Sequence, residues 1–479
     1  MNAGKTDMSA SGGGGNRWWG DDEPTTQGRK FDVLVPLDLR LGSEVEMAQL
    51  VADSCARKYG EFIFADGNFW VFIETMWHRV PEQAMRRIVH RFDGAVVGKA
   101  KVKIKSSTVT GVIKECIAVS AEPEFFESPA IGLNARNTVV TIDGKGKIST
   151  HRHRPDDRHR FTIEADYKPD ADGYPTRDTL LDTLLTGSFM GDDDAAQKID
   201  LIGEILGAAA YGMATHLPQP KAFIFHGETA NNGKSQIAAL VEKLLPPTAV
   251  SHIPLSAFGD EKRIVNLAGK AANVVEELSG QTIAGENFKA AVTGQPIEGR
   301  DLYKSAMTFY PRALHLCTTN VLPNFSGGID RGLQRRLVVL QFNRTIPDDE
   351  IITDIADRIG ETEMDLLIAF AVEGAKRLVG ARAYTIPESS RIALNEWLLK
   401  DPVNAWLDEK FEIDRDYVVI WRSVKELFQL FQAWCNSDGI PAKYMPSREN
   451  FSIRLFRVPG IQKRRISSGS EVCCLKDRR

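Results

Sequence analysis

Residues 227–235 read Gly-Glu-Thr-Ala-Asn-Asn-Gly-Lys-Ser, a pattern that could bind phosphate groups. A short apolar run precedes them, and apolar residues at helical spacing follow until Pro246. In a strand–loop–helix unit, loop N–H groups and the helix N-terminus face an anion, lysine adds positive charge and serine can ligate Mg²⁺. The sequence therefore predicts a cradle for ATP and Mg²⁺ formed by Gly227, Glu228, Thr229, Ala230, Asn231, Asn232, Gly233, Lys234 and Ser235.

This loop departs from the strict phosphate-loop pattern at one position. The pattern G-x-x-x-x-G-K-S requires glycine at 228, where this chain has Glu228, and Gly227 stands one residue too early. We expect a loop that is one residue longer or that pivots on another residue. A chance Gly-Lys-Ser at a helix start is the alternative, but the flanking strand and helix are the context that the motif requires.

Two later apolar runs end in side chains suited to ATP hydrolysis. Residues 271–275 lead to Glu276 and Glu277, and residues 313–317 lead to Asn320. An acid at a strand end beside the cradle can hold Mg²⁺, its neighbour can orient water, and an amide can hold the attacking water or the γ-phosphate. We therefore expect Ser235 and Glu276 to hold the metal. For the two acids, the alternative is an ordinary helix start.

Basic residues occur at two further places in this part of the chain. Arg335 and Arg336 precede another apolar strand, where an arginine could reach the γ-phosphate of a neighbouring subunit, as an arginine finger does. A solvated arginine pair is the alternative. Arg300, Tyr303 and Lys304 lie in a hairpin-like segment, and basic residues beside an aromatic ring suit the backbone and base of a DNA strand.

The whole chain limits the class of protein. Its 479 residues suggest roughly three domains. Its net charge of −4 means that any nucleic-acid contact must come from local basic patches. The six cysteines have no zinc-site spacing, and no apolar run approaches the ~18 residues of a membrane span. No secretory signal opens the chain. We expect a cytoplasmic protein with reduced thiols and no membrane contact.

Composition and periodicity divide the chain into six segments. They are a disordered tail (1–30), an α/β domain (31–165), a helical collar or oligomerisation segment (166–218), an ATPase core (219–345), a helical segment (346–400) and a C-terminal DNA-binding domain (401–479). The last segment reads as two helices, the second capped by Ser447, followed by a hairpin with Lys463, Arg464 and Arg465. This order is typical of a winged helix, with the three basic residues available for DNA phosphates.

Three other clusters each allow two interpretations. Residues 151–160 read HRHRPDDRHR, which suits either a metal or nucleic-acid site or a solvated linker, and we favour the linker. Asp192, Asp193 and Asp194 could bind a metal, but we favour a cap for the following helix. Cys473 and Cys474 are neighbours in an expected strand, which would point their thiols to opposite faces.

The motifs, in this order, resemble those of superfamily-3 helicases, and most closely the phage and plasmid primase-helicases related to the poxvirus D-five-type ATPases. The resembling stretches are GETANNGKS, NVVEEL, FKAAVTGQPIEGRDLYK, LHLCTTNVLPNF and DRGLQRRLVVLQF. Residues 138–217 also resemble the lead-in domain of that family, and the C-terminal residues resemble its winged helix. The resemblance covers most of residues 31–479.

This resemblance implies an α/β protein with an AAA+-like core that assembles into a ring, expected to be a hexamer, and translocates along single-stranded DNA. It implies phosphate and Mg²⁺ binding by Lys234 and Ser235, an acidic pair at residues 276–277, a sensor at Asn320, and a finger at Arg335 or Arg336. Lys304, with Tyr303, falls where such helicases place a DNA-gripping hairpin. The longer cradle and glutamate in place of the commoner aspartate are the departures.

The predicted function is that of an ATP-dependent DNA helicase for phage, prophage or plasmid replication. The region before residue 166 shows no carboxylate pattern of a primase. Two alternatives remain: an AAA+ switch or remodeller that never unwinds DNA, and a replication initiator that reads duplex origin DNA through residues 405–479. ATP hydrolysis that single-stranded DNA does not stimulate would favour the remodeller, and duplex binding without ATP hydrolysis would favour the initiator.

Overall fold

The computed structural model describes residues 31–478 apart from 170–177, 277–282, 301–305, 324, 326–328, 330, 400–401, 438–444 and 468. The expected tail (1–30) and the candidate residues Glu277, Tyr303 and Lys304 lie outside the described residues. The chain divides into two compact units, the first within residues 1–121 and the second comprising residues 122–479 with 64–67 and 72–77. Within the described residues, no helix combines the length and hydrophobicity that crossing a bilayer requires.

The first unit is built around three helices. They are α1 (Glu44–Tyr59), α2 (Glu82–His90) and α3 (Ser106–Ser120). The unit also contains the hairpin of β4 (Val96–Val97) and β5 (Ala100–Lys101). The strands β1 (Phe62–Ala65), β2 (Asn68–Ile73) and β3 (Met76–Val80) form one sheet in that order, and their residues are divided between the two units. Ser43 caps α1 by accepting a hydrogen bond from the Glu46 N–H. α1 packs on α3, where the Cys116 thiol donates to the Ala48 carbonyl.

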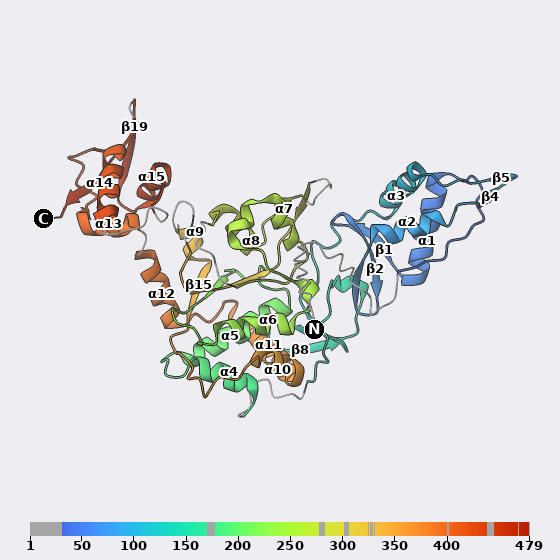
Figure 1. Ribbon diagram of the computed structural model, residues 1–479, viewed down its shortest axis with the longest axis horizontal. Helices are drawn as coiled ribbons and strands as arrows, with labels where there is room; N and C mark the ends of the chain where they lie inside the picture. The colour runs from blue at the N-terminus through green and yellow to red at the C-terminus, as the bar shows by residue number, and fades with distance from the viewer. Residues whose placement is uncertain are drawn as a thin grey trace, which may run out of the picture. The chain divides into compact units, whose positions relative to one another are not determined.

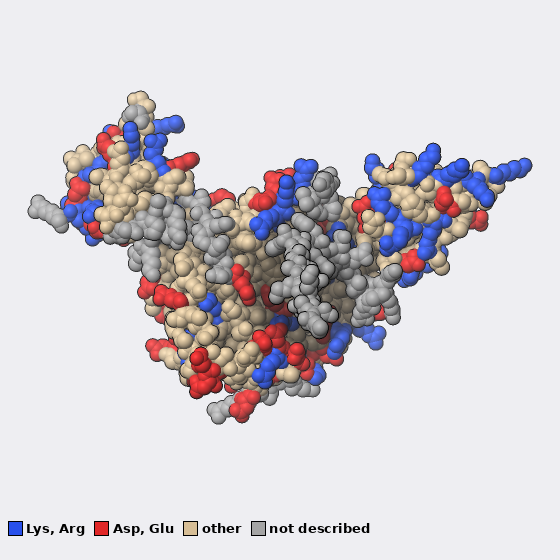
Figure 2. All heavy atoms as spheres, viewed as in Figure 1, with Lys and Arg blue, Asp and Glu red and all other residues tan. Residues whose placement is uncertain are grey.

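Lysine and arginine side chains gather on the surface of this unit (Figure 2). Lys99, Lys101, Lys103 and Lys105 are all exposed and alternate with Ala100, Val102 and Ile104. Successive side chains of an extended chain point to opposite sides, so Lys101, Lys103 and Lys105 share one side, while Lys99 lies in the turn between β4 and β5. None of the four forms an ion pair with any described residue. This lysine row is therefore a positively charged surface without a neutralising acid.

The second unit contains a parallel sheet of five strands. They are β9 (Ala222–His226), β10 (Val250–Ser251), β11 (Ala272–Val275), β14 (Leu314–Thr319) and β15 (Leu337–Gln341). The order across the sheet is β10-β11-β14-β9-β15, and every neighbouring pair is parallel. The first strand of the set therefore lies between the last two. The prediction of an α/β fold is confirmed.

Helices cover both faces of this sheet (Figure 1). Phe223 and Phe225 of β9 are buried on one face, whose core includes side chains of α4 (Leu180–Ser188), α5 (Ala195–Ala210), α6 (Lys234–Leu244), α10 (Ile355–Thr362) and α11 (Met364–Ala381). Ala222 and Ile224 are buried on the other, with α7 (Glu261–Ile264), α8 (Gly285–Thr293) and α12 (Glu388–Leu399). The period-two alternation of β9 thus separates the two cores.

Shorter elements complete this unit. β6 (Leu133–Asn134), β7 (Val139–Ile142) and β8 (Ile148–His151) form an antiparallel sheet. β12 (Ile297–Gly299) and β13 (Met307–Phe309) form an antiparallel pair, and α9 (Arg331–Gln334) precedes β15. β7 and β8 are consecutive strands that pair with Val139 opposite His151 and Ile142 opposite Ile148.

The aspartates of residues 192–194 do not act as a simple helix cap. Asp194 occupies the N-cap position of α5 but makes no side-chain capping bond. Its carboxylate instead accepts from the Ser389 N–H at 2.8 Å and lies 3.7 Å from the ammonium of Lys198. Lys198 is fully buried, pairs with Asp192 at 2.8 Å and donates to the Gln341 carbonyl at 2.9 Å. Asp192 and Asp194 therefore compensate the charge of the buried Lys198. This corrects the predicted helix cap, and nothing in the sequence pattern indicated the buried lysine.

The histidine-rich segment is not a solvated linker. Asp157 and His159 are buried, and Asp157 lies 3.7 Å from His151 and 3.9 Å from Arg154. Arg160 pairs with Asp66 and covers the ring of Phe126 at 3.8 Å. The described residues contain no cluster of three or more His, Cys, Asp or Glu side chains that could together hold a metal ion. This segment packs against distant parts of the chain.

The C-terminal residues contain the expected helices and hairpin. The elements are α13 (Pro402–Lys410), β16 (Phe411–Ile413), β17 (Arg422–Ser423), α14 (Val424–Ser437), α15 (Arg448–Arg457), β18 (Gln462–Ile466), β19 (Gly469–Cys473) and β20 (Leu475–Asp477). Ser447 caps α15 as predicted. The expectation for the cysteine pair is wrong: Cys474 has a φ of 72°, and the two sulfurs lie 3.6 Å apart.

Glycines let α5 and α11 approach closely, and this contact gives a stability prediction. A Cβ atom at Gly374 would lie 1.9 Å from the Gly203 carbonyl oxygen, a backbone atom that cannot move aside. We expect Gly374→Ala to lower the free energy of unfolding by about 1–3 kcal/mol, because the helices must separate. Urea denaturation followed by circular dichroism measures the change.

Gly380 on the same helix provides the matched control. A Cβ atom there meets nothing within 4 Å, so Gly380→Ala should raise stability by about 0.5–1 kcal/mol through helix propensity alone. Equal effects of the two substitutions would contradict the close α5–α11 contact.

Candidate functional site

The ends of three neighbouring strands bring most of the candidate residues to one edge of the five-stranded sheet. Thr319 of β14 is in register with His226 of β9, and Val275 of β11 is in register with Cys317 of β14. Because the strands are parallel, Gly227, Glu276 and Asn320 all follow strand ends at this carboxyl edge. The loop, one acid and the amide thus follow neighbouring strands, although Gly227 and Asn320 are about 90 residues apart in the sequence.

The loop between β9 and α6 is held by its own side chains. Asn232, which is 2% exposed, donates to the Thr229 carbonyl at 2.8 Å and accepts from the Lys234 N–H at 3.4 Å. A Cβ atom at residue 227 would lie 2.2 Å from the Asn232 amide nitrogen. Asn231 and Gly233 have φ values of 53° and 83°. The loop therefore accommodates its extra residue by burying the Asn232 side chain, which bonds to the loop backbone and packs against Gly227.

The segment after β15 anchors the same loop. The Ile346 N–H donates to the Asn231 carbonyl at 2.7 Å, and the Thr345 hydroxyl bonds to the Thr229 hydroxyl at 3.0 Å. Gln236 of α6 accepts a bond from the Ala356 N–H at 3.1 Å. Sequence reasoning missed this anchoring, because residues 345–356 carry no motif that points to a phosphate loop.

The start of α6 presents the chemical groups that an anion needs. Gly233 is its N-cap and has no side chain of its own, while the Lys234 N–H donates to the Asn232 amide oxygen over a long 3.4 Å. Lys234 is half-buried, with its ammonium 3.4 Å from the Asn232 amide oxygen, and Ser235 is exposed. A helix N-terminus beside a lysine is suited to a phosphate, and an exposed hydroxyl next to it is suited to Mg²⁺.

Glu276 and Asn320 are both exposed where their strands end. The residues before them are buried, and the Thr319 hydroxyl accepts a bond from the Val321 N–H at 3.1 Å, which turns the chain after β14. Their side chains are thus free of the core and available at the carboxyl edge. Glu277, the other acid of the pair, lies outside the described residues.

A cavity next to the loop was not predicted from the sequence. It has an empty volume of about 1180 Å³, counting the part open to solvent, and its lining includes Asn231, Gly233 and Gln236. Its other walls come from α4 and from residues 344–355, including Leu184, Ile346, Ile351, Ile352 and Ile355. Apolar walls beside a polar loop suit a ligand with one apolar ring and one anionic end.

The two arginines before β15 lie at the opposite, amino edge of the sheet. Leu337 is in register with Ala222, and the Ala222 N–H donates to the Arg336 carbonyl at 2.7 Å. The Arg336 guanidinium donates to the Gly332 carbonyl at 2.6 Å, whereas Arg335 is exposed. The length of β15, roughly 13 Å or more, separates both from the loop at residues 227–235 of the same chain.

The other basic candidates differ in their surroundings. Arg300 is exposed directly after β12. On β18, Arg464 is bound by Glu471 at 2.6 Å and lies 4.2 Å from the Trp421 ring. Lys463 and Arg465 flank it and are exposed, so the alternation of the strand puts them on the other face. The three residues therefore do not form one continuous basic surface.

Comparison with known families gives two matches. Residues 48–185 match a family model described as D5 N terminal like, and residues 225–336 match a family of unknown function, DUF5906. The first match begins 90 residues before the lead-in region expected from the sequence. It supports a relationship to a primase-helicase type of family from phage replication. No curated protein matches the sequence significantly.

Among solved structures, two apo structures of the NrS-1 C terminal region are similar to this chain. Both are of the A form, and the first shares 12% identity at a TM-score of 0.44 and covers 84% of each chain. The other shares 12% identity at a TM-score of 0.41 and covers 91% of this chain and 100% of that one. Scores of this size do not establish a common fold.

The geometry of the loop predicts that Gly233 cannot be replaced. Its φ of 83° disfavours any side chain, and a Cβ atom would lie 2.1 Å from the Ser188 hydroxyl. We expect Gly233→Ala to weaken binding of a fluorescent ATP analogue by about 1–3 kcal/mol, because binding must restore the strained loop. Fluorescence titration measures the affinity.

Glu228→Gln is the control within the same loop, since Glu228 is exposed. It should leave affinity within a few-fold of wild type. Wild-type affinity in Gly233→Ala would show that the observed loop conformation is not the binding one.

Proposed function

We propose that this protein is an ATP-dependent DNA helicase of superfamily 3 that serves phage, prophage or plasmid replication. The observation that carries the proposal is the meeting of the loop at residues 227–235, Glu276 and Asn320 at one edge of a parallel sheet. A helix N-terminus, a metal-binding acid and a polar sensor are the parts that ATP hydrolysis requires. The phage primase-helicase type of family indicated by residues 48–185 agrees with this function.

ATP fits the site as follows. Loop N–H groups and Lys234 would bind the phosphates, and the apolar side of the adjacent cavity would accept the base. Ser235 and Glu276 would hold Mg²⁺, which neutralises the charge that develops on the phosphates. Glu277 would orient the attacking water, and Asn320 would contact the γ-phosphate or that water. Each role follows from the position of the residue after a strand end.

The arginine pair supports assembly into a ring. Because Arg335 and Arg336 lie at the amino edge, neither would act on the phosphates of its own subunit. An arginine finger in a ring is supplied by the neighbouring subunit, so this position suits a homo-oligomer, for which we propose a hexamer. Arg335 is the better candidate, since it is exposed while Arg336 bonds to its own α9 turn.

DNA would be contacted at more than one surface. We propose that Arg300, Tyr303 and Lys304 in the connection between β12 and β13 contact single-stranded DNA. Lys463 and Arg465 in the proposed winged helix, with Arg464 restrained by Glu471, would contact duplex origin DNA. The lysine row of the first unit is a further surface suited to a phosphate backbone.

The central test is the removal of the loop lysine. Lys234→Ala should abolish ATP hydrolysis, with a loss of at least about 100-fold, because the charge that binds the phosphates is gone. A phosphate-release assay with and without single-stranded DNA measures the rate. Full turnover in this variant would end the proposal. Lys243→Ala, on the same helix and paired with Asp357, is the control and should keep its activity.

A strand-displacement assay separates the helicase from its two alternatives. Unwinding with DNA-stimulated hydrolysis supports the helicase. Hydrolysis without DNA stimulation or unwinding favours a remodeller, and duplex binding without hydrolysis favours an initiator.

Mixing experiments test the arginine pair. Arg335→Ala should reduce hydrolysis by roughly 10³-fold while leaving nucleotide binding intact, because the finger acts on a neighbour's phosphate. Mixed with Lys234→Ala subunits, it should recover part of the activity, since some interfaces then combine an intact loop with an intact arginine. If Arg336→Ala shows this behaviour and Arg335→Ala does not, the finger is Arg336. Absence of recovery from both would exclude a shared site.

A further inference from the structure

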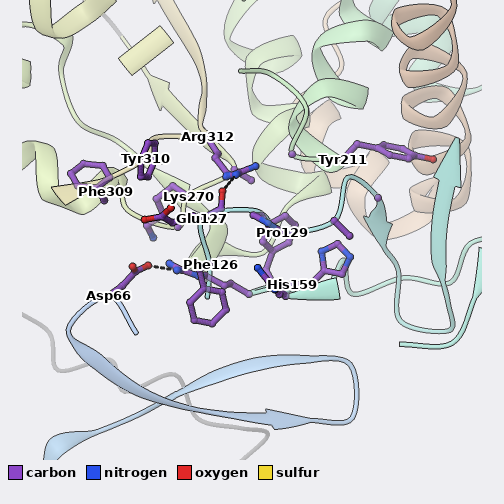
Figure 3. Close-up of a pocket in the computed structure, with 18 of the residues that line it drawn as sticks. Asp66, Phe126, Glu127, Pro129, His159, Tyr211, Lys270, Phe309, Tyr310 and Arg312 are labelled. Atoms are coloured by element: carbon purple, nitrogen blue, oxygen red, sulfur yellow. Dashed lines mark hydrogen bonds and ion pairs between the residues drawn. The ribbon is translucent and has the colours of Figure 1, made fainter. Parts of the chain in front are cut away.

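A second cavity lies at the amino edge of the sheet, away from the phosphate loop (Figure 3). Lys270 lies two residues before β11, and Arg312 lies two residues before β14. Phe309 is the last residue of β13, and Tyr310 follows it. Residues 123–132 and 158–161 form much of the remaining wall. The empty volume is about 860 Å³, counting the part open to solvent. The function proposed above makes no use of this space.

Positive charge exceeds negative charge around the cavity. Four basic side chains line it, against the carboxylates of Asp66 and Glu127. These are Arg158, Arg160, Lys270 and Arg312. Asp66 is already bound by Arg160 (Figure 3). His159 adds no charge at neutral pH, because burial lowers its pKa to about 4.

Of these four cations, Arg160 alone has an acidic partner among the described residues. Arg158 lies over the Phe125 ring at 4.8 Å, and Lys270 and Arg312 bond to backbone carbonyls. The Lys270 ammonium donates to the Thr248 carbonyl at 2.7 Å. The Arg312 guanidinium donates to the Glu127 carbonyl and lies 2.8 Å from the His216 ring nitrogen. Burial lowers the pKa of both, and Arg160 lowers the pKa of Arg312 further. A bound anion would remove this cost of the charged forms.

Aromatic surface is available beside these cations. Tyr310 is 42% exposed, whereas Phe309 is buried and the face of Phe126 is covered by Arg160. An exposed ring next to unpaired cations is the combination that binds a base by stacking and a phosphate by charge. Thr308 and Phe309, at the C-terminal end of β13, also line the cavity. The connection at the other end of the β12–β13 pair is proposed above to contact DNA.

We propose that this cavity binds one nucleotide unit, with its phosphate at Lys270 and Arg312 and its base against Tyr310. The unit is either part of a DNA strand held at the β12–β13 pair or a free mononucleotide, and the strand is the source that the location favours. This inference rests on the proposed function, because it assigns the cavity to the path of the DNA.

The test uses the full chain and a fluorescein-labelled oligodeoxythymidylate, with affinity measured by anisotropy over a range of salt concentrations. The double variant Lys270→Ala/Arg312→Ala should bind at least roughly tenfold more weakly at low salt. Its plot of log affinity against log salt should be shallower by about 0.7, because one phosphate contact is lost. Tyr310→Ala should lower the affinity by roughly 5- to 100-fold without changing this slope.

Lys376→Ala/Arg391→Ala is the matched control, because it also removes one lysine and one arginine, each paired with a glutamate on its own helix. It should match the wild type in affinity and slope. dTMP is also titrated into the Lys234→Ala variant, with and without the double substitution. Binding of dTMP that the double substitution weakens identifies a free mononucleotide as the source. Binding of the oligonucleotide but not dTMP identifies the strand.

Equal affinity and slope in the double variant and the control, for both probes, would overturn the proposal. Should the double variant fail to fold, as judged by its thermal melting, wild-type affinity of Tyr310→Ala would overturn it instead. The proposed function fails separately, when the wild-type protein hydrolyses no ATP.

Discussion

The parallel register of β9, β11 and β14 is the constraint on which the candidate site depends. Strands that run in the same direction end at the same edge, so a loop, an acid and an amide placed after strand ends become neighbours. The order β10-β11-β14-β9-β15 puts the loop-bearing strand between two strands that follow it in sequence. The same register moves the arginine pair to the far edge, which separates the groups that would act within one subunit from those that would act on another.

Buried polar contacts keep the loop in place. Asn232 closes it from within, and residues 345–346 bind it from outside. Just before that segment, the Gln341 carbonyl accepts from Lys198, whose partner Asp192 also accepts from the Asn343 amide at 3.1 Å. A buried ion pair of this kind contributes little net stability, but losing one partner costs about 3–5 kcal/mol. The network therefore fixes the geometry of the chain after β15, and through it the loop.

Local signals in the sequence predicted local structure well. The apolar run, loop and helix at residues 223–245 appear as β9 and α6, and the Ser447 cap and the hairpin after it appear as predicted. Each depends on residues a few positions apart, so periodicity and capping residues suffice. The α1 and α3 helices of the first unit were not identified, although Ser43 supplies a cap for α1.

Features that depend on distant residues could not be predicted. The charged run at residues 151–160 is partly buried because Asp66, Phe125 and Phe126 contact its arginines, and nothing within the run indicates these partners. The cavity beside the loop combines α4 with residues 344–355, about 160 residues apart. The cysteine pair failed for a different reason: a left-handed residue at 474 interrupts the expected strand alternation. In each case tertiary contacts or one backbone angle override the local pattern.

The strand order also has a consequence for how the protein is made. A ribosome releases β9 before β14 and β15, yet these two are the strands that pair with its edges. At about 5–20 residues per second, both edges of an apolar strand stay open for roughly 5–20 seconds while the intervening chain is synthesised. During that interval the nascent chain exposes the kind of edge on which other chains can add strands. The helices α5 and α6 pack on one face of β9, so they leave both edges open until β14 and β15 pair with it.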